Sequence, residues 1–458
     1  MKPLLYILLF FATTIYGQNL ENISQLEVKK DVAYIKHAIE DASVNPYRSI
    51  SEKRFHKLLK RAERRLSKKS AVTPVEFYTA FQPVIAKLRD GHTELNISDY
   101  IYHTDYKKFP FKVELQENSL YIKAITNGYE QYFPKSVIGK KIRKIDHEDS
   151  SKIIKLFGSY TSAESKRSSI ALSQYYFNDY FNVLLNKNSK LSIDIEDHDE
   201  LIIKILRKSQ INTEHQQARK FENFSYTLKE ENNCAVLTLN SFSGLEDFKT
   251  FLTDFFSTLK KNNIKNLVID LRENGGGNSQ LGDELLSYLI SEPFTQYEKT
   301  ITKYSDTQKH FIKSLTDAEE KYRQTILKKK SGTVETTDKS KILIFPKKLE
   351  QRFNGNVFIL ISGQTFSSAA DFANACQYYK VGTIIGEETG GFVVSSGETI
   401  EVALPHSKLK LNISTTEDYN VGAKAESRHG VKPHVNVSAS KALDYTLKQI
   451  KKIEVSTN

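Results

Sequence analysis

The sequence of 458 residues has few cysteines and no long hydrophobic run. Its two cysteines, Cys234 and Cys376, are too few for a disulfide framework. A membrane-spanning helix needs roughly 20 apolar residues in succession, and the chain has no such stretch. No cluster of His, Cys and acidic residues has metal-ligand spacing, so we expect no metal and no other cofactor. The composition, with 39% hydrophobic and 26% charged residues, is that of a globular protein.

The chain is basic overall. Its formal net charge is +11, from 66 basic and 55 acidic residues. Such a balance is compatible with nucleic acid or an anionic surface as a partner. Because the sequence has no nucleic-acid-binding motif, we expect no nucleic-acid partner and a solvated, lysine-rich surface instead. An alternative is that some of the basic groups attract the carboxylate end of a peptide.

The first residues differ from the rest of the chain. One positive charge at Lys2 precedes an apolar run at 4–12, small or neutral residues follow to Gly17, and the chain turns polar at Gln18. This order is typical of a bacterial signal peptide over residues 1–17. The run is too short for a membrane span, and no cysteine follows it to carry a lipid anchor. We therefore expect an exported protein, periplasmic or extracellular, that is not inserted in the membrane after signal removal.

The remaining chain changes pattern along its length, which suits two or three domains. Residues 18–100 have apolar positions at helical spacing and predict a helical domain. Residues 103–208 alternate as half-buried strands do and predict a β-rich domain, and 209–222 are a polar linker. From 223 to 458 short apolar strands alternate with helices, which indicates an α/β layered core. A polar, lysine-rich segment at 292–350 interrupts the core as an insertion or lid.

A serine pair follows the predicted strand at 356–361, where the chain turns into a helix that begins at Ser368. A strand, a sharp turn and a helix expose a side chain beside unpaired helix N–H groups, which favour negative charge. Ser368 is therefore a candidate nucleophile, and Ser367 competes with it by position. The alternative is a capping box, in which Ser368 acts with Asp371 three residues later.

A glycine triplet at 275–277 follows the predicted strand at 266–270. Consecutive glycines let backbone N–H groups approach a ligand closely, as in an anion nest or an oxyanion hole. A tight turn is the structural alternative. A phosphate loop is disfavoured because the Lys-Ser/Thr pair of such loops is missing.

A histidine stands just past a predicted helix end, in Asp90-Gly91-His92-Thr93. It is one of 11 histidines, and by itself it is typical of a surface or capping residue. Its candidacy as a general base depends on the other segments.

Taken in order, these segments resemble the C-terminal processing protease and tricorn-core family of serine peptidases. The resemblance covers roughly residues 75–440. The family's nucleophile segment, S-A-x-E/D, selects Ser368 over Ser367. The four segments that carry the resemblance are Leu-Arg-Asp-Gly-His-Thr at 88–93, Asp-Leu-Arg-Glu-Asn-Gly-Gly-Gly at 270–277, Thr-Phe-Ser-Ser-Ala-Ala-Asp at 365–371 and Gly-Glu-Glu-Thr-Gly-Gly at 386–391.

The family has two catalytic arrangements. Its processing-protease branch uses a Ser–Lys dyad, but the place of that lysine reads Gly391-Phe392-Val393-Val394 here. Its tricorn-like branch uses Ser, His and a late Glu, and Glu426 matches the E-x-x-x-G-V-x-P segment of that branch. The resemblance therefore implies a Ser-His-Glu peptidase.

The resemblance also implies a role for each matching residue. His92 takes the proton of Ser368, and Glu426 orients or polarises the site. The residues expected around this set are Ala369 and Gly276 or Gly277 as oxyanion N–H donors, with Gly91 and Asp371 in support.

The fold implied by the resemblance is a ClpP/crotonase-like layered α/β peptidase core with an N-terminal helical domain and a PDZ-like domain at 103–208. PDZ domains receive an extended peptide as an added strand, although Lys140 stands here where the family has an acidic residue. We expect an exported serine peptidase that hydrolyses peptides or unfolded proteins, and no signal indicates an oligomeric state. The alternatives are a catalytically silent binding protein for apolar ligands or peptides on the same fold, and a PDZ-like scaffold. The intact set of Ser368, His92 and Glu426 favours the enzyme.

Overall fold

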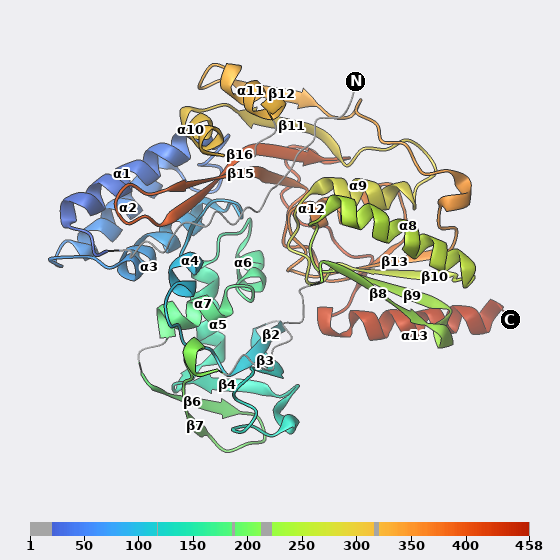
Figure 1. Cartoon of the computed structure of the whole chain (residues 1–458), viewed down its shortest axis with the longest axis horizontal. Coiled ribbons are helices and arrows are strands. Elements are labelled where there is room, and N and C mark those ends of the chain that lie inside the picture. The colour runs from blue at the N-terminus through green and yellow to red at the C-terminus, as the bar shows by residue number, and fades with distance from the viewer. Residues whose placement is uncertain (1–20, 117, 186–187, 212–221, 316–319, 458) are drawn as a thin grey trace.

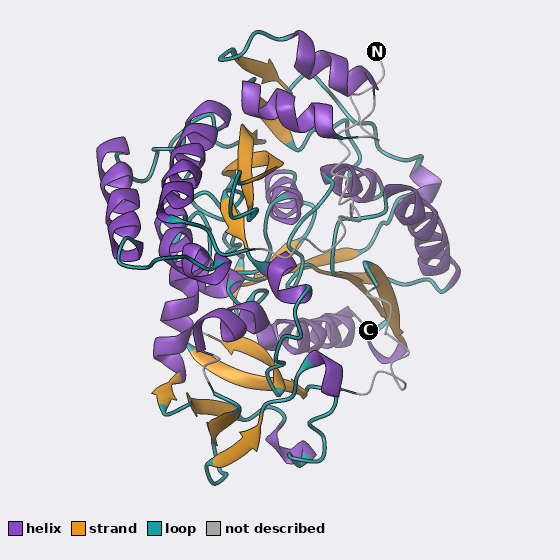
Figure 2. Cartoon of the chain, turned by 60° about the vertical axis from the view of Figure 1, so that its left-hand side comes forward, coloured by secondary structure: helices purple, strands orange, loops and turns teal. Residues whose placement is uncertain are grey.

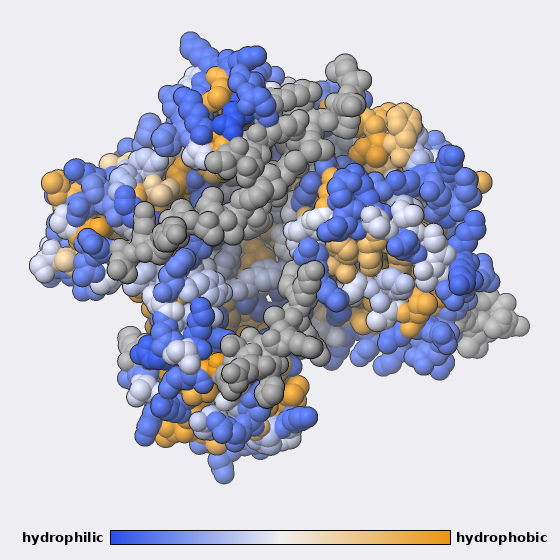
Figure 3. All heavy atoms as spheres, in the orientation of Figure 1, coloured by the Kyte–Doolittle hydropathy of each residue, from blue (hydrophilic) through white to orange (hydrophobic). Residues whose placement is uncertain are grey.

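The computed structural model describes residues 21–457, apart from 117, 186–187, 212–221 and 316–319. The predicted signal peptide and most of the predicted linker lie outside these residues. The chain forms three sheets with helices around them (Figure 1). None of the described helices is long and apolar enough to cross a membrane. On the face of the molecule drawn in Figure 3, most of the described residues are hydrophilic.

The described chain begins with helices, as predicted for this region. Two of them start with capping boxes, Ser24 with Glu27 and Thr73 with Glu76, which occupy N–H groups that the helix leaves unpaired. Pro74 suits the first position of its helix because no N–H is needed there. The elements are α1 (Gln25–Ala42), α2 (Glu52–Leu66), α3 (Pro74–Ile85) and the 3-10 turn η1 (Ala86–Leu88).

Residues 103–208 form the predicted β-rich domain, which lies at the lower end of the molecule in two views (Figure 1, Figure 2). Its antiparallel sheet has the order β2-β3-β4-β6-β7, with β5 beside β4. The strands are β2 (Phe111–Gln116), β3 (Ser119–Ile125), β4 (Lys141–Ile145), β5 (Glu148–Asp149), β6 (Lys190–Ile195) and β7 (Leu201–Lys204). The helices before and within the domain are α4 (Ser98–Tyr102), α5 (Ser150–Tyr160), α6 (Lys166–Leu172) and α7 (Phe177–Tyr180).

The predicted α/β core is confirmed by a six-stranded sheet in the order β17-β14-β13-β10-β9-β8, parallel except for β8. Its strand β10 is buried along its length because α8, α9 and α12 cover one face and α13 covers the other (Figure 1). The strands are β8 (Phe224–Lys229), β9 (Cys234–Leu239), β10 (Asn266–Asp270), β13 (Asn356–Ile361), β14 (Thr383–Gly386) and β17 (Val435–Asn436). The helices are α8 (Leu245–Lys261), α9 (Ser279–Ser287), α12 (Ser368–Tyr378) and α13 (Ala439–Thr457).

Two strands of the segment 292–350, β11 and β12, belong to a further sheet, in which β1-β16-β11-β12 lie in that order and β15 pairs with β16. The segment also contacts α1, where Lys303 Nζ donates to the Glu40 carbonyl at 2.6 Å and the Thr307 N–H donates to Asp41 at 2.9 Å. The elements are β1 (Glu94–Asn96), β11 (Tyr297–Lys303), α10 (Asp306–Ser314), α11 (Glu320–Lys328), β12 (Val334–Asp338), β15 (Val394–Ala403) and β16 (Lys410–Asn420).

Candidate active site

Three loops meet at the carboxyl ends of β10 and β13. These strands are parallel neighbours with Asp270 opposite Leu360, so the loops that follow them leave the sheet at the same edge. The Phe366 N–H donates to the Asn274 carbonyl at 3.0 Å and joins the two loops. The third loop, residues 89–93, connects η1 to β1. The glycine triplet, the serine turn and the predicted histidine therefore lie together.

Ser367 occupies the turn at the start of α12 with a backbone that few non-glycine residues adopt. Its φ is 51° and its ψ is −135°. Such a conformation costs about 1–3 kcal/mol and is found mainly at functional sites. The Ser367 Oγ lies 3.1 Å from Nε2 of His92, and the His92 ring stacks on Phe366 with ring centroids 4.9 Å apart. This is the pairing of a nucleophile with its general base.

The structure does not bring Ser368 to His92, so the predicted pair is corrected to Ser367 and His92. Ser368 is the first residue of α12, and its Oγ donates to the carbonyl of Gly277 at 3.0 Å. The capping alternative is not formed either, because Ser367 holds the cap position and its side chain makes no capping hydrogen bond. The sequence pattern failed by one residue because it does not specify which of two adjacent serines adopts positive φ.

The loop that carries His92 is fixed by the buried Asp90. One carboxylate oxygen of Asp90 accepts the His92 backbone N–H at 2.9 Å, and the other accepts the hydroxyls of Thr93 and Ser414. Burial lowers the pKa of the His92 imidazole below its ordinary value, so the ring is neutral near pH 7 and can accept a proton. Its buried Nδ1 has no hydrogen-bond partner among the residues that the structure describes.

Glu164, which no sequence pattern selected, is buried beside the same loop. Its carboxyl lies 3.1 Å from the position that a Cβ on Gly91 would take, and the same Cβ would come within 2.5 Å of the Phe366 ring. Within the described chain, neither carboxyl oxygen accepts a hydrogen bond of good geometry. The pKa of Glu164 is raised to about 8, mainly by burial and in part by the charge of Asp90, while Arg428 acts in the opposite direction. Glu164 therefore holds its proton at pH 7.

Two of the three N–H groups predicted as oxyanion donors, those of Ala369 and Gly276, are engaged in other hydrogen bonds. The Ala369 N–H donates to the Phe366 carbonyl at 3.2 Å, and the Gly276 N–H donates to the Asn274 side chain at 2.8 Å. The N–H of Ser368 is the first of α12, and the first N–H groups of a helix have no carbonyl to bond within it. It follows the new nucleophile candidate directly, as one oxyanion donor does in serine hydrolases of the nucleophile-elbow type.

Two glycines of the triplet are required by their backbone and by the available space. Gly276 has a φ of +102°, and a Cβ there would lie 2.7 Å from Cβ of Ser367. Gly277 has a φ of +139°, and a Cβ there would collide with the Phe242 carbonyl. Gly276 therefore packs directly against the serine turn, and a side chain at either position would force its neighbours apart.

The two predicted acids lie in different surroundings. Asp371 is buried in the first turn of α12, where it accepts hydrogen bonds from Tyr297 and Asn420 at 2.8 Å each. Burial raises the pKa of Asp371 to about 7. Glu426 is exposed, and its backbone carbonyl accepts the Arg428 N–H at 2.8 Å. Asp371 thus connects α12 to the sheet of β11 and β16, whereas the structure does not bring Glu426 to the histidine.

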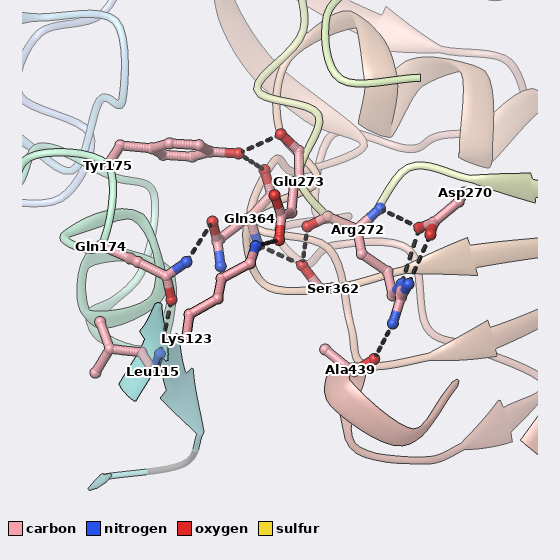
Figure 4. Close-up of polar contacts among 10 residues, drawn as sticks. All are labelled: Leu115, Lys123, Gln174, Tyr175, Asp270, Arg272, Glu273, Ser362, Gln364 and Ala439. Atoms are coloured by element: carbon pink, nitrogen blue, oxygen red, sulfur yellow. Dashed lines mark hydrogen bonds and ion pairs between the residues drawn. The ribbon is translucent and has the colours of Figure 1, made fainter. Parts of the chain in front are cut away.

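The β-rich domain contacts both loops of the core at one place (Figure 4). The Tyr175 hydroxyl donates to the carbonyls of Glu273 at 2.9 Å and of Gln364 at 3.3 Å. An ion pair between Glu273 and Lys123 of β3 adds to this contact. Because Glu273 precedes the glycine triplet and Gln364 precedes the serine turn, the β-rich domain is connected to both. No pattern in the sequence indicated this contact.

Comparison with known proteins identifies the core. Residues 233–437 match the model of peptidase family S41. This segment of the chain is therefore that of peptidase family S41. The structures of mature CPAF in complex with lactacystin and of mature CPAF are both similar to this chain, with a TM-score of 0.66 and 13% identity. The match covers 94% of this chain and 99% of the first structure, and 93% of this chain and 97% of the second.

A photosystem II D1 C-terminal processing protease matches with a TM-score of 0.46 and 14% identity, over 95% of this chain and 98% of that protein. No curated protein sequence matches the chain. At 13% identity the two CPAF structures establish the fold, and the family match of residues 233–437 indicates a serine peptidase. The chain is thus a serine-type peptidase with helical and β-rich domains beside its S41 core, as the sequence predicted.

The S41 segment contains only part of the site. Ser367, the glycine triplet and Glu426 lie within residues 233–437, whereas His92 and Glu164 lie outside them. The candidate base, His92, therefore comes from the chain that joins the N-terminal helices to β1.

One cluster of metal-ligand side chains lies elsewhere in the S41 peptidase. Among the described residues, Glu40, Glu52 and His56 have ligand atoms within 4.8 Å of one another. Glu40 already bonds the Tyr47 hydroxyl and the His56 ring, and the cluster shares no residue with the active site.

Proposed function

We propose that this S41 peptidase is an exported enzyme that hydrolyses peptide bonds in peptides or unfolded proteins, with Ser367 as nucleophile and His92 as general base. The observation that carries the proposal is the distance of 3.1 Å between Ser367 Oγ and His92 Nε2. The positive φ of Ser367 supports it, because such a backbone persists where the surrounding structure enforces it. A protein that only binds ligands needs neither feature, so the silent-binder alternative is not favoured.

The chemistry follows from the surroundings of the two side chains. His92 is neutral because burial lowers its pKa, and it takes the Ser367 proton as Oγ attacks the substrate carbonyl. The oxyanion that forms is stabilised by the Ser368 N–H at the positive end of α12, with a second donor from the backbone of the glycine triplet. Protonated His92 then gives its proton to the leaving amine, and water hydrolyses the acyl-enzyme by the same route.

Active-site labelling with a fluorophosphonate probe tests the choice between the two serines. Ser367→Ala should abolish both labelling and peptide cleavage. Ser368→Ala should retain both within about tenfold, because it removes one hydrogen bond to Gly277, worth about 1 kcal/mol, and leaves the Ser368 N–H in place. Labelling that persists in Ser367→Ala and disappears in Ser368→Ala would return the nucleophile to Ser368.

We further propose that Glu426 completes a Ser-His-Glu arrangement when the turn that carries it closes over bound substrate. The buried Nδ1 of His92 has no acceptor in the described chain, and the imidazolium formed during catalysis needs one. Arg428, two residues further along the same turn, already acts electrostatically on the buried Glu164.

The Glu426 proposal predicts a large effect on rate and none on stability. In a serine-protease triad, replacing the acid by its amide costs ~10⁴ in kcat, and the looser arrangement here should cost about 10²-fold in Glu426→Gln. Because Glu426 is exposed, the unfolding temperature should not change. A variant with wild-type kcat would remove Glu426 from the arrangement.

Export is proposed on the basis of residues 1–17. Mass spectrometry of the protein recovered from the periplasm or the medium should show a chain that begins near Gln18. A cytoplasmic protein that retains residues 1–17 would contradict export without affecting the peptidase assignment.

A further inference from the structure

Helix α2 and the turn after it carry a high density of basic side chains. Of the 17 residues from 53 to 69, nine are Lys or Arg and one, Glu63, is acidic. All nine basic side chains are exposed. In the described part of the chain, Lys69 pairs with Glu76, and the other eight form no ion pair. With Glu52 and Glu63 as its two acidic residues, α2 thus carries a strongly positive surface.

The basic side chains line a groove between α2 and α3. One part of it, of about 500 Å³, is lined by Leu58, Arg61, Arg64, Arg65, Pro83, Val84 and Lys87. A second part, of about 380 Å³, shares Leu58 and Arg61 with the first and continues along α2 to Ser51. Leu58, Pro83 and Val84 contribute apolar surface between the cationic groups. The groove therefore offers apolar contacts and positive charge together.

An acidic polypeptide segment fits this surface better than a membrane or a nucleic acid. Helices that bind membranes present large apolar side chains, and no exposed large hydrophobic residue lies between 27 and 101 in the described chain. Single-stranded nucleic acids need exposed aromatic rings to stack on, and the one phenylalanine of α2, Phe55 in its first turn, is fully buried. In contrast, Arg61, Arg64 and Arg65 can bind carboxylates through two N–H groups each.

The groove ends close to the catalytic base. Lys87 lines it, and the chain continues through η1 and Asp90 to His92. Five residues span at most about 18 Å, so a polypeptide that leaves the groove at Lys87 reaches the active site within about six extended residues.

We propose that the groove between α2 and α3 is an exosite that binds acidic segments of the substrate polypeptide and holds the adjoining segment near Ser367. The assignment of the bound chain as substrate rests on the proposed peptidase function. Binding to the groove is electrostatic, so it weakens as salt screens the charges.

Fluorescence anisotropy with an inactive full chain tests binding apart from catalysis. The protein carries Ser367→Ala, and the probe is a labelled peptide in which Glu alternates with Leu, compared with the same peptide containing Gln. The groove variant is Arg61→Gln/Arg64→Gln/Arg65→Gln. The matched control, Lys313→Gln/Lys328→Gln/Lys330→Gln, removes three equally exposed charges near α10 and α11.

Compared with the Ser367→Ala protein, the groove variant should have a Kd for the acidic peptide at least about tenfold higher, and the control should have a Kd within about twofold. The Gln peptide should bind weakly to all three proteins. Equal binding of the acidic peptide to the groove variant and the control would overturn the proposal. The proposal would also be overturned if phosphatidylglycerol vesicles or duplex DNA bound the protein more tightly than the acidic peptide does and lost this binding in the groove variant. Because the exchanged side chains are exposed, thermal unfolding should be the same for all three proteins.

Kinetics with the active enzyme connect the groove to catalysis. For a peptide substrate with an acidic extension, the groove variant should raise KM about tenfold and leave kcat unchanged, whereas a neutral substrate should show no change. An enzyme that cleaves both substrates with unchanged KM would overturn the exosite. A protein that binds the acidic peptide and cleaves nothing would refute the peptidase proposal alone.

Discussion

Replacing Gly276 by alanine should damage catalysis more than it damages the fold. The new Cβ would lie 2.7 Å from Cβ of Ser367 and 2.8 Å from the Phe366 carbonyl, whereas ordinary contacts begin at 3.4 Å. The two loops must therefore separate by about 0.7 Å or more, and a misplacement of about 1 Å in an active site costs ~10²-fold in rate. The φ of +102° adds backbone strain of about 1–3 kcal/mol in the alanine variant.

Gly275→Ala is the matched control for this experiment. A Cβ on Gly275 would meet only Tyr175, at an ordinary 3.9 Å. We expect kcat/KM and the rate of fluorophosphonate labelling to fall about 10²-fold in Gly276→Ala and less than about twofold in Gly275→Ala. Thermal unfolding, measured in parallel, should show a folded Gly276→Ala protein with a reduced unfolding temperature. Labelling of Gly276→Ala at the wild-type rate would refute the packing of the glycine triplet against Ser367.

Two further predictions concern pH. His92 accepts a proton only when neutral, and burial lowers its pKa. We therefore expect kcat/KM to rise with pH and to reach half of its maximum below about pH 6.5. A half-maximum above pH 7 would contradict the assignment of His92 as the base. Glu164 has its pKa raised from 4.5 to about 8, so the folded state binds an extra proton and the free energy of unfolding should fall as pH rises through this range. The side chain in Glu164→Gln cannot ionise. In denaturant unfolding, the free energy of unfolding of this variant should therefore fall less between pH 5 and pH 9 than that of the wild type. An equal fall in both proteins would count against a buried, titrating Glu164.

The loops of the site could be predicted because each carries a local signature at the end of a regular element. The apolar runs at 266–270 and 356–361 indicate buried parallel strands, and the glycine triplet and the serine pair come directly after them. Neighbouring parallel strands have their carboxyl ends, and hence their next loops, at one edge of the sheet. The position of the site in the fold was therefore predictable from the pattern of strands and turns.

The choice of side chains within these loops was less predictable. Ser367 differs from the helical Ser368 in having a positive φ, and positive φ at a non-glycine residue has no signature in the sequence. Glu164 comes from the chain before α6 and is recognised only by its burial beside Gly91. The distance from Glu426 to His92 depends on how a surface turn folds, which the spacing of residues does not determine.

The geometry of the dyad is set by a strand that carries neither of its members. β16 is hydrogen-bonded to β1, the strand that directly follows the His92 loop. From β16, Ser414 donates to Asp90, which fixes that loop, and Asn420 donates to Asp371 in the first turn of α12, directly after Ser367. One strand thus positions both His92 and Ser367, the proposed base and nucleophile, which are 275 residues apart in the sequence. If Ser367 and His92 act as proposed, the antiparallel sheet positions both of them, and the S41 segment alone would contain the proposed nucleophile without the proposed base.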